Sequence, residues 1–274
     1  MSTHRNYSSS PALPGKSKQS KLHERIVNFL THPQERNYNP YYTMIGQKLA
    51  SESRSIQITM QYLLWDFFRE LGEKEVGGQE MLKSLNFDQD NMQQDYHNPN
   101  CNVDPKKLHH FAWAYGWWIA KGSLPITVLK PLPFGCLKQK TQEFLAILIS
   151  LMFLSVHSSS PTLILSSSST TSTPVTSSTK SAKVDSMLLT TTFKKILVNS
   201  TLSQSFLSFL VDENPQSGYN FYLNKLIKQP LCSNISSNRL DFFGTMVPQD
   251  RLVYFLNLIT SSKSFVVDFL SDRL

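Results

Sequence analysis

Residues 109–130 read HHFAWAYGWWIAKGSLPITVLK and hold three of the four tryptophans of the chain. Asp104 and Pro105 precede this stretch, in the order that starts helices. An Asp side chain caps free backbone N–H groups, and a proline at the first helical position loses no needed donor. Apolar residues then recur on one face (Leu108, Phe111, Ala112, Tyr115 and Ile119) and on another (Trp113 and Trp117). Such a helix is expected to pack between neighbouring helices.

The end of this stretch predicts a sharp change of direction. Gly122 ends the long helix, and Pro125 leads directly into a short second helix over residues 126–129. Glycine tolerates the left-handed backbone that often terminates a helix, and proline cannot continue one.

Helical patterns also organise the residues on both sides. Asn39 and Pro40 repeat the capping device, and the apolar face expected after them comprises Tyr41, Met44, Ile45 and Leu49. Residues 54–71 form an amphipathic helix, with apolar side chains at Ile56, Met60, Leu63, Leu64, Phe67 and Leu71 and a C-cap at Gly72. Further helices are expected over residues 137–156, 186–199, 201–211, 220–228 and 248–274. No strand alternation stands out, so we predict an all-α fold of stacked antiparallel helical hairpins, a HEAT-like α-solenoid.

Three segments have compositions that do not favour packing. Residues 1–20 are rich in Ser, Pro and Lys and are expected to form a disordered basic head. Residues 72–103 form a polar, acidic loop. Seventeen of the twenty-five residues in 155–179 are Ser or Thr, so residues 155–185 are expected to be a linker or insertion. The helical region is then expected over residues 21–154, with the last helices of the domain in 186–229, and residues 230–274 are expected to form a helical tail without an assigned role.

Charge and cysteine content narrow the class of protein. The net charge is +7, yet residues 31–130 carry ten Lys/Arg against eleven Asp/Glu, so the basic excess lies outside the aromatic stretch. Nucleic-acid binding needs clustered cations. Three cysteines without paired spacing predict neither a disulfide framework nor a zinc site. The apolar run over residues 144–156 has thirteen residues, fewer than the roughly 20 of a membrane span, and indicates a buried helix.

The motifs of common enzymes do not occur in the sequence. There is no phosphate-binding loop, dinucleotide fingerprint, H-E-x-x-H, C-x-x-C or G-x-S-x-G. His109 and His110 are adjacent and point about 100° apart on a helix, whereas a metal pair needs i,i+4 spacing. Asp66 and Glu70 share a helical face that we interpret as a solvated charged face. We therefore expect no enzyme activity, no cofactor, no metal and no small-molecule substrate.

A short pattern typical of protein phosphatase docking occurs twice. It reads RIVNF at residues 25–29 and RLVYF at residues 251–255. Docking of this kind needs an extended strand, whereas both copies lie within helical periodicity. A protein phosphatase partner is therefore kept only as a hypothesis.

Three stretches together resemble the MI domain, also called MA-3: NYNPYYTMIGQKLA (37–50), QYLLWDFFRELGE (61–73) and FAWAYGWWIAKGSLPITVLKPLPF (111–134). They are most similar to the C-terminal part of nucleolar proteins that join a middle domain of the initiation-factor-4G type to an MI domain. The resemblance covers about residues 22–156, and residues 194–211 resemble the last helices of the family. It implies a helical repeat fold, a location in the nucleus and nucleolus, and a role in small-subunit rRNA processing and ribosome biogenesis.

The resemblance also implies a partner and its contact residues. MI domains bind a DEAD-box helicase of the initiation-factor-4A type through an acidic loop with an L-D-x-P signature before the long helix. The matching residues are Val103, Asp104 and Pro105, with Lys106 next, so Asp104 carries over as a partner-binding residue. Asn100 stands where the family has an acidic residue four positions earlier. Asp104 is also expected to cap the helix.

Compared with the family, the chain lacks the middle domain and the opening helix pair of the MI domain. We therefore expect a fold that is incomplete at its N-terminal end, as in a fragment or a shortened isoform, with exposed apolar surface where those helices would pack. The main alternative is an RNA-binding or translation-regulatory MI-domain module that contacts pre-ribosomal RNA. Its signature would be aromatics interleaved with Lys/Arg, but Lys121 is the only cation near the tryptophans.

Overall fold

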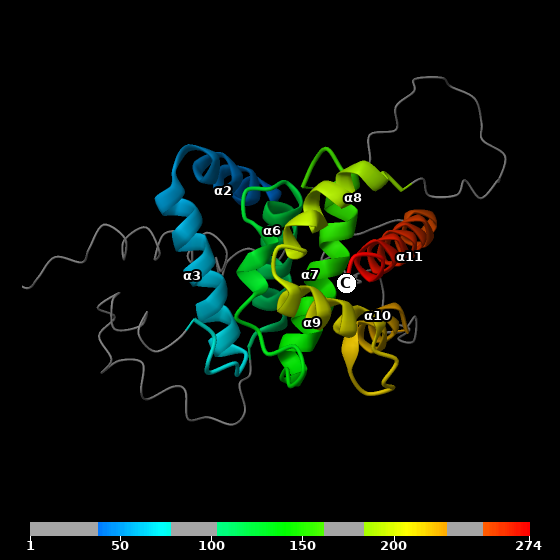
Figure 1. The fold of residues 1–274 in the computed structure, drawn as a ribbon. Coiled ribbons are helices and arrows are strands. Elements are labelled where there is room, and N and C mark those ends of the chain that lie inside the picture. Colours follow the sequence, from blue (N-terminus) through cyan, green and yellow to red (C-terminus); the bar gives the residue numbers. More distant parts are fainter. Residues whose placement is uncertain (1–37, 78–102, 162–183, 229–248) are drawn as a thin grey trace, which may run out of the picture.

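The computed structural model describes residues 38–77, 103–161, 184–228 and 249–274. All regular secondary structure within these ranges is helical, which confirms the predicted all-α class (Figure 1). The elements are α2 Pro40–Glu52, α3 Arg54–Glu70, α6 Pro105–Ala120, η1 Ile126–Leu129, α7 Gln139–His157, α8 Ser186–Phe193, η2 Lys194–Ile196, α9 Ser200–Val211, α10 Gly218–Lys228 and α11 Gln249–Ser271.

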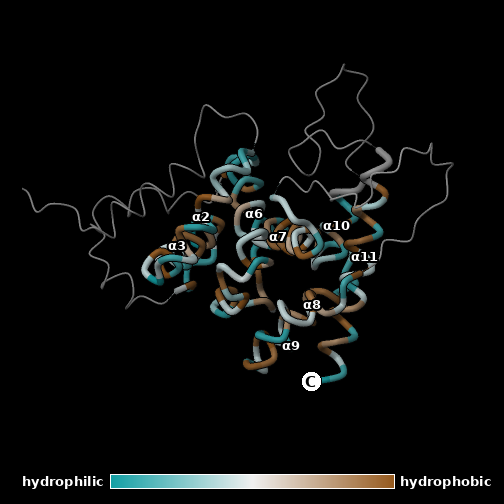
Figure 2. The backbone as a smooth tube through the Cα atoms, turned by 90° about the horizontal axis from the view of Figure 1, so that it is seen from above, coloured by the Kyte–Doolittle hydropathy of each residue, from teal (hydrophilic) through white to brown (hydrophobic). Residues whose placement is uncertain are grey.

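Helix α7 lies at the centre of the described fold. It contacts α6, α8, α10 and α11, and in Figure 2 these helices lie around it. Its residues from Phe144 to Val156 are all buried, including the small polar Ser150 and Ser155. The most apolar run of the chain is therefore the core of the fold, as expected from its length. Within the described ranges, one helical stretch, residues 253–271 of α11, is long and apolar enough to cross a membrane.

The predicted helix starts are confirmed at atomic detail. The Asn39 side chain accepts a hydrogen bond from the backbone N–H of Tyr41 at 3.0 Å, and Asp104 accepts one from Lys106 at 2.9 Å. Pro40 and Pro105 occupy the first helical positions after these caps. Capping residue and proline thus place α2 and α6 as the sequence predicts.

The predicted helix ends and the short second helix are also found. Gly72 and Gly122 follow α3 and α6 with positive φ angles of 107° and 73°, and Ile126–Leu129 forms the 3-10 helix η1. The left-handed backbone at these positions explains why the chain has glycine there.

The predicted apolar face of α2 is wrong. Tyr41 and Met44 are 63% and 54% exposed, and the buried residues are Thr43, Gly46 and Ala50. The reason is the close approach of the Trp118 ring, since a Cβ atom at position 46 would lie 2.4 Å from its Cζ2. Only small side chains fit beneath this ring, so α2 packs through its small residues rather than its large ones.

Successive helices do not all run antiparallel. On α3 and α6, Met60 pairs with Tyr115 and Glu70 with Lys107, which shows an antiparallel pair. On α6 and α7, Gly116 faces Leu151, and Lys121 reaches Ser158 just beyond the end of α7, so these two helices run in the same direction. Residues 121–138, including η1, run back along α6 before α7 begins, so α7 starts at the same end as α6. The expectation of antiparallel neighbours is therefore wrong for this pair.

The Ser/Thr tract and the tail have other boundaries than expected. Helix α7 continues to His157, and Ser155, Val156 and Ser158 are buried, so the first residues of the expected linker belong to the core. Helix α11 packs against α7, α8 and α9 and buries a stripe of side chains: Phe255, Leu258, Ile259, Val266, Phe269 and Leu270. The tail therefore contributes to the same core as the preceding helices.

Several expectations concern residues outside the described ranges. They are the basic head 1–20 and the first residues of the expected helical region 21–154, most of the acidic loop 72–103 including Asn100, the centre of the Ser/Thr tract, and residues 229–248. The RIVNF pattern at residues 25–29 also lies there.

Candidate functional site

The tryptophans of the central stretch are core residues rather than an exposed aromatic surface. Trp113, Trp117 and Trp118 are 2%, 4% and 1% exposed. The Trp118 indole donates to the backbone carbonyl of Thr43 at 2.8 Å, and the Trp117 indole donates to Gln47 Oε1 at 2.6 Å. The rings hold α2 against α6, and their faces are not available to stack on a nucleic-acid base.

The fourth tryptophan holds the returning connection in place. The Trp65 indole on α3 donates to the backbone carbonyl of Val128 at 2.8 Å, and Ile126, Val128 and Leu129 are buried. A buried donor of this kind stabilises a fold only when it finds an acceptor. The connection between α6 and α7 is therefore part of the core.

The polar surface of α6 begins at Asp104. Three features hold Asp104 in place. The preceding Val103 is buried, with 7% of its surface exposed, and the following Pro105 restricts the backbone. In addition, Asp104 Oδ1 accepts a hydrogen bond from the Lys106 backbone N–H. Asp104 itself is exposed. The site thus presents a carboxylate to solvent in a fixed position at the N-terminal end of a helix.

The two lysines that follow have different environments. The Lys106 side chain is exposed, beside Asp104. Lys107 Nζ lies 2.6 Å from both carboxylate oxygens of Glu70 and 5.7 Å from the centre of the Phe67 ring on α3. Lys107 therefore links α6 to α3, and Glu70 is part of an interhelical ion pair rather than of a purely solvated face.

Two acidic residues on or just after α3 also have structural partners. Asp66 pairs with Arg69, whose Nη1 also donates to the Val76 carbonyl at 2.5 Å. Glu73 is 5% exposed and accepts the Lys138 N–H at 2.7 Å, where α7 begins. A carboxylate at this end of a helix is favoured by the unpaired N–H groups and the helix dipole. The sequence patterns did not point to the contacts of Glu70 and Glu73, because their partners Lys107 and Lys138 lie 37 and 65 residues further along the chain.

The lysine of the AKGSL segment has a structural role at the other end of α7. Lys121 Nζ donates to the Ser158 carbonyl at 2.6 Å and lies 4.8 Å from the centre of the Trp117 ring. Burial lowers the pKa of this lysine. Its contacts explain why a cation suits this position, where the last carbonyls of α7 lack helical partners.

The histidine pair and the RLVYF pattern belong to helices of the fold. His109 and His110 are half-buried on α6, and His110 lies beside the Tyr38 ring, with centroids 6.0 Å apart. The RLVYF pattern lies within α11, where its Phe255 is 3% exposed, so this helix does not offer the pattern as an extended strand. No cluster of three or more metal-ligating side chains occurs among the described residues.

Comparison with known proteins gives one limited similarity and no family assignment. The chain is 23% identical over 122 residues to Suppressor of glycerol defect protein 1 of Schizosaccharomyces pombe. The match covers 44% of this chain and 13% of that protein, so the chain corresponds to a small part of the relative. No family model matches the chain. No solved structure matches it either.

Proposed function

We propose that this chain is a non-catalytic protein-interaction scaffold of the MI-domain type. It binds a DEAD-box RNA helicase of the initiation-factor-4A type and acts in small-subunit rRNA processing and ribosome biogenesis in the nucleolus. The observation that carries the proposal is the exposed Asp104 carboxylate, held at the start of α6 by its backbone cap. The chain is similar to only a small part of a longer relative, which is in keeping with a module that occurs within larger proteins.

Asp104 has the properties that a contact with a helicase requires. A carboxylate fixed on a rigid helix loses little conformational freedom on binding. It can accept charge-assisted hydrogen bonds from Arg or Lys of a partner. Because Lys107 is paired with Glu70, it offers less competition for Asp104 than a free lysine would. Lys106 and Asn100 are the neighbouring residues that we propose to contribute to the same contact.

The packing of the first helices supports a further proposal, that the helices form a HEAT-like stack of hairpins. Helices α2 and α3 contact one another, and α3 pairs antiparallel with α6. Tyr41 and Met44 expose large apolar side chains on α2. We propose that a further helix pair covers this face, as the resemblance implies. The parallel arrangement of α6 and α7 is a departure from a regular stack.

An RNA-binding or translation-regulatory role is the alternative proposal. Burial of the three tryptophans favours a protein partner, because single-stranded RNA is bound on exposed aromatic faces between cations. Direct contact with pre-ribosomal RNA can be tested by fluorescence anisotropy at several salt concentrations. Affinity that falls steeply with salt would support this alternative.

The proposal can be tested with purified components. The intact chain, immobilised on beads, is expected to retain an initiation-factor-4A-type helicase, and Asp104→Lys is expected to abolish this retention by placing a cation opposite the cations of the partner. Equal retention by both proteins would show that the start of α6 is not the contact.

A further inference from the structure

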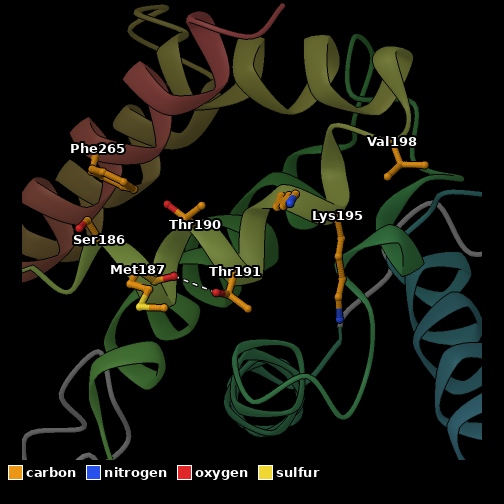
Figure 3. Close-up of a pocket in the computed structure, with 8 residues that line it drawn as sticks. Ser186, Met187, Thr190, Thr191, Lys195, Val198 and Phe265 are labelled. Atoms are coloured by element: carbon orange, nitrogen blue, oxygen red, sulfur yellow. Dashed lines mark hydrogen bonds between the residues drawn. The ribbon is translucent and has the colours of Figure 1, made fainter.

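An open groove lies between α8–η2 and α11 (Figure 3). It has a volume of about 760 Å³. One wall consists of residues spaced three, four, seven, eight and eleven positions from Met187, namely Thr190, Thr191, Lys194, Lys195 and Val198. Met187, Thr190 and Thr191 lie on α8, Lys194 and Lys195 lie on η2, and Val198 lies in the turn that follows η2. Phe265 of α11 forms part of the opposite side.

The apolar side chains of this groove are unusually exposed. Met187 is 79% exposed and Val198 is 89% exposed, while Phe265 is half-buried. The Thr191 hydroxyl donates to the Met187 carbonyl at 2.9 Å, so it does not need a partner from outside. Large apolar side chains that stay this exposed beside a hollow in the surface are costly in water and mark candidate interaction surfaces. Methionine also adapts its shape readily to a ligand.

The charge within this groove is positive. Lys194 and Lys195 are both exposed, and neither forms a salt bridge with another of the described residues. No Asp or Glu is among the described residues that line the groove. A ligand with carboxylates opposite these two lysines would therefore gain attraction without displacing an existing ion pair among those residues.

We propose that this groove binds an acidic amphipathic helix of a partner protein. The eight residues of α8 and the three residues of η2 together span roughly 18 Å at α-helical and 3-10 rise, which matches about three turns of a bound helix. Apolar side chains of that helix would contact Met187 and Phe265 at one end and Val198 at the other, with Asp or Glu between them facing Lys194 and Lys195.

A protein helix fits this groove better than a nucleic acid does. Nucleic-acid sites use several cations along a backbone and exposed aromatic faces for the bases. Among the described residues that line this groove there are two lysines and one aromatic residue, Phe265. The inference does not rest on helicase binding at Asp104, because it uses no residue of α6.

The test is a selection from a displayed library of 16-residue helical peptides with randomised surface positions, using the intact chain as bait. Enriched peptides are expected to combine two or three large apolar residues with Asp or Glu between them. Their dissociation constants are then measured for the wild type, for Lys194→Glu/Lys195→Glu and for Met187→Ser/Val198→Ser. The control variant Lys48→Glu/Lys140→Glu makes the same change in net charge at exposed lysines outside the groove.

We expect both groove variants to weaken binding at least about tenfold and the control to leave it unchanged. Peptides in which Lys replaces Asp and Glu are expected to recover binding to Lys194→Glu/Lys195→Glu, which also shows that this variant is folded. The proposal fails if no acidic peptide is enriched, or if the enriched peptides bind both groove variants as tightly as the wild type. It also fails if the lysine pair instead mediates binding to vesicles of phosphatidylserine and phosphatidylcholine.

Discussion

Trp118 and Thr43 lie 75 residues apart and are joined by a buried hydrogen bond of 2.8 Å from the indole N–H to the backbone carbonyl. This bond places the Trp118 ring directly against Gly46 of α2. The pair α2–α6 is therefore held by one large side chain that lies over a glycine, and the stability of this end of the fold depends on that fit.

The first prediction concerns this close approach. A Cβ atom at position 46 would lie 2.4 Å from Trp118 Cζ2 and 3.0 Å from the Met60 side chain. Gly46→Ala is therefore expected to lower the free energy of unfolding by about 1–3 kcal/mol, despite the higher helix propensity of alanine. Urea unfolding followed by circular dichroism measures this change.

The matched control is Gly135→Ala. At this position, an added Cβ meets no atom within 4 Å, and the glycine does not have a positive φ angle. The substitution should leave stability unchanged or raise it by a few tenths of a kcal/mol. Equal effects of the two substitutions would contradict the packing of Trp118 against Gly46.

A second prediction separates a core role of the aromatic stretch from a binding role. Trp117 is 4% exposed, and its removal in Trp117→Ala is expected to cost about 3–5 kcal/mol, a large part of the stability of an ordinary domain. The variant should unfold at a much lower urea concentration. Tyr41→Ala, at a 63% exposed aromatic residue, should change stability by less than about 0.5 kcal/mol. A Trp117→Ala protein that keeps its stability but loses a partner would show that this tryptophan is a contact residue.

The third prediction is a pH dependence of the packing of α11. His157 at the end of α7 lies 3.2 Å from the Ser262 hydroxyl of α11 and accepts the Asp185 N–H at 3.4 Å through Nδ1. Burial lowers the pKa of His157, and Lys121 lowers it further, while Asp185 opposes the shift. Because the folded state disfavours the protonated ring, its stability is complete above the ordinary histidine pKa of about 6.5 and decreases as the pH falls below it.

The measurement compares wild type with His157→Gln, which retains hydrogen-bonding groups but does not titrate. Between pH 7.5 and 5, the wild type should lose more unfolding free energy than the variant. Amide hydrogen exchange should show the loss of protection first in α11. Identical pH profiles of the two proteins would mean that His157 is protonated equally easily in the folded and unfolded states.

The starts and ends of helices could be predicted because their signals are local. Asn39 and Asp104 cap α2 and α6 through a side chain that reaches the N–H two residues later, and Gly72 and Gly122 supply the left-handed backbone after α3 and α6. The burial of α7 followed from its uninterrupted apolar composition. Each of these features depends on residues within one or two helical turns.

The errors have a common cause, which is packing between distant segments. The apolar residues of α2 gave no indication that Trp118 would require a face of small residues. The periodicity of α11 showed an amphipathic helix but not that His157 and α7 would be its neighbours. The connection between the parallel helices α6 and α7 is likewise fixed by a distant residue, because the Trp65 indole donates to the carbonyl of Val128, 63 residues further along the chain. At the candidate site, the cap at Asp104 was predicted, whereas the Glu70–Lys107 pair was not.

A fourth prediction uses the departure of this chain from the family pattern. Asn100 stands where the resembled domains carry an acidic residue. If the helicase contact of those domains is retained, Asn100→Asp should add a charge-assisted contact and tighten helicase binding several-fold, with a stronger dependence on salt. Asn100→Gln keeps the amide and is the control. Weaker or unchanged binding by Asn100→Asp would show that this position is not used.

The most direct test of the proposed function is the dissociation constant of an initiation-factor-4A-type helicase for Asp104→Asn, measured by isothermal titration calorimetry. Asparagine caps helices as well as aspartate does, so this substitution removes the charge and preserves α6. Asp185→Asn makes the same change at the cap of α8. We predict that Asp104→Asn weakens binding about tenfold with unchanged thermal stability, while Asp185→Asn binds like the wild type. Wild-type affinity of a folded Asp104→Asn protein, or no helicase binding by the wild-type chain, would contradict the proposed function.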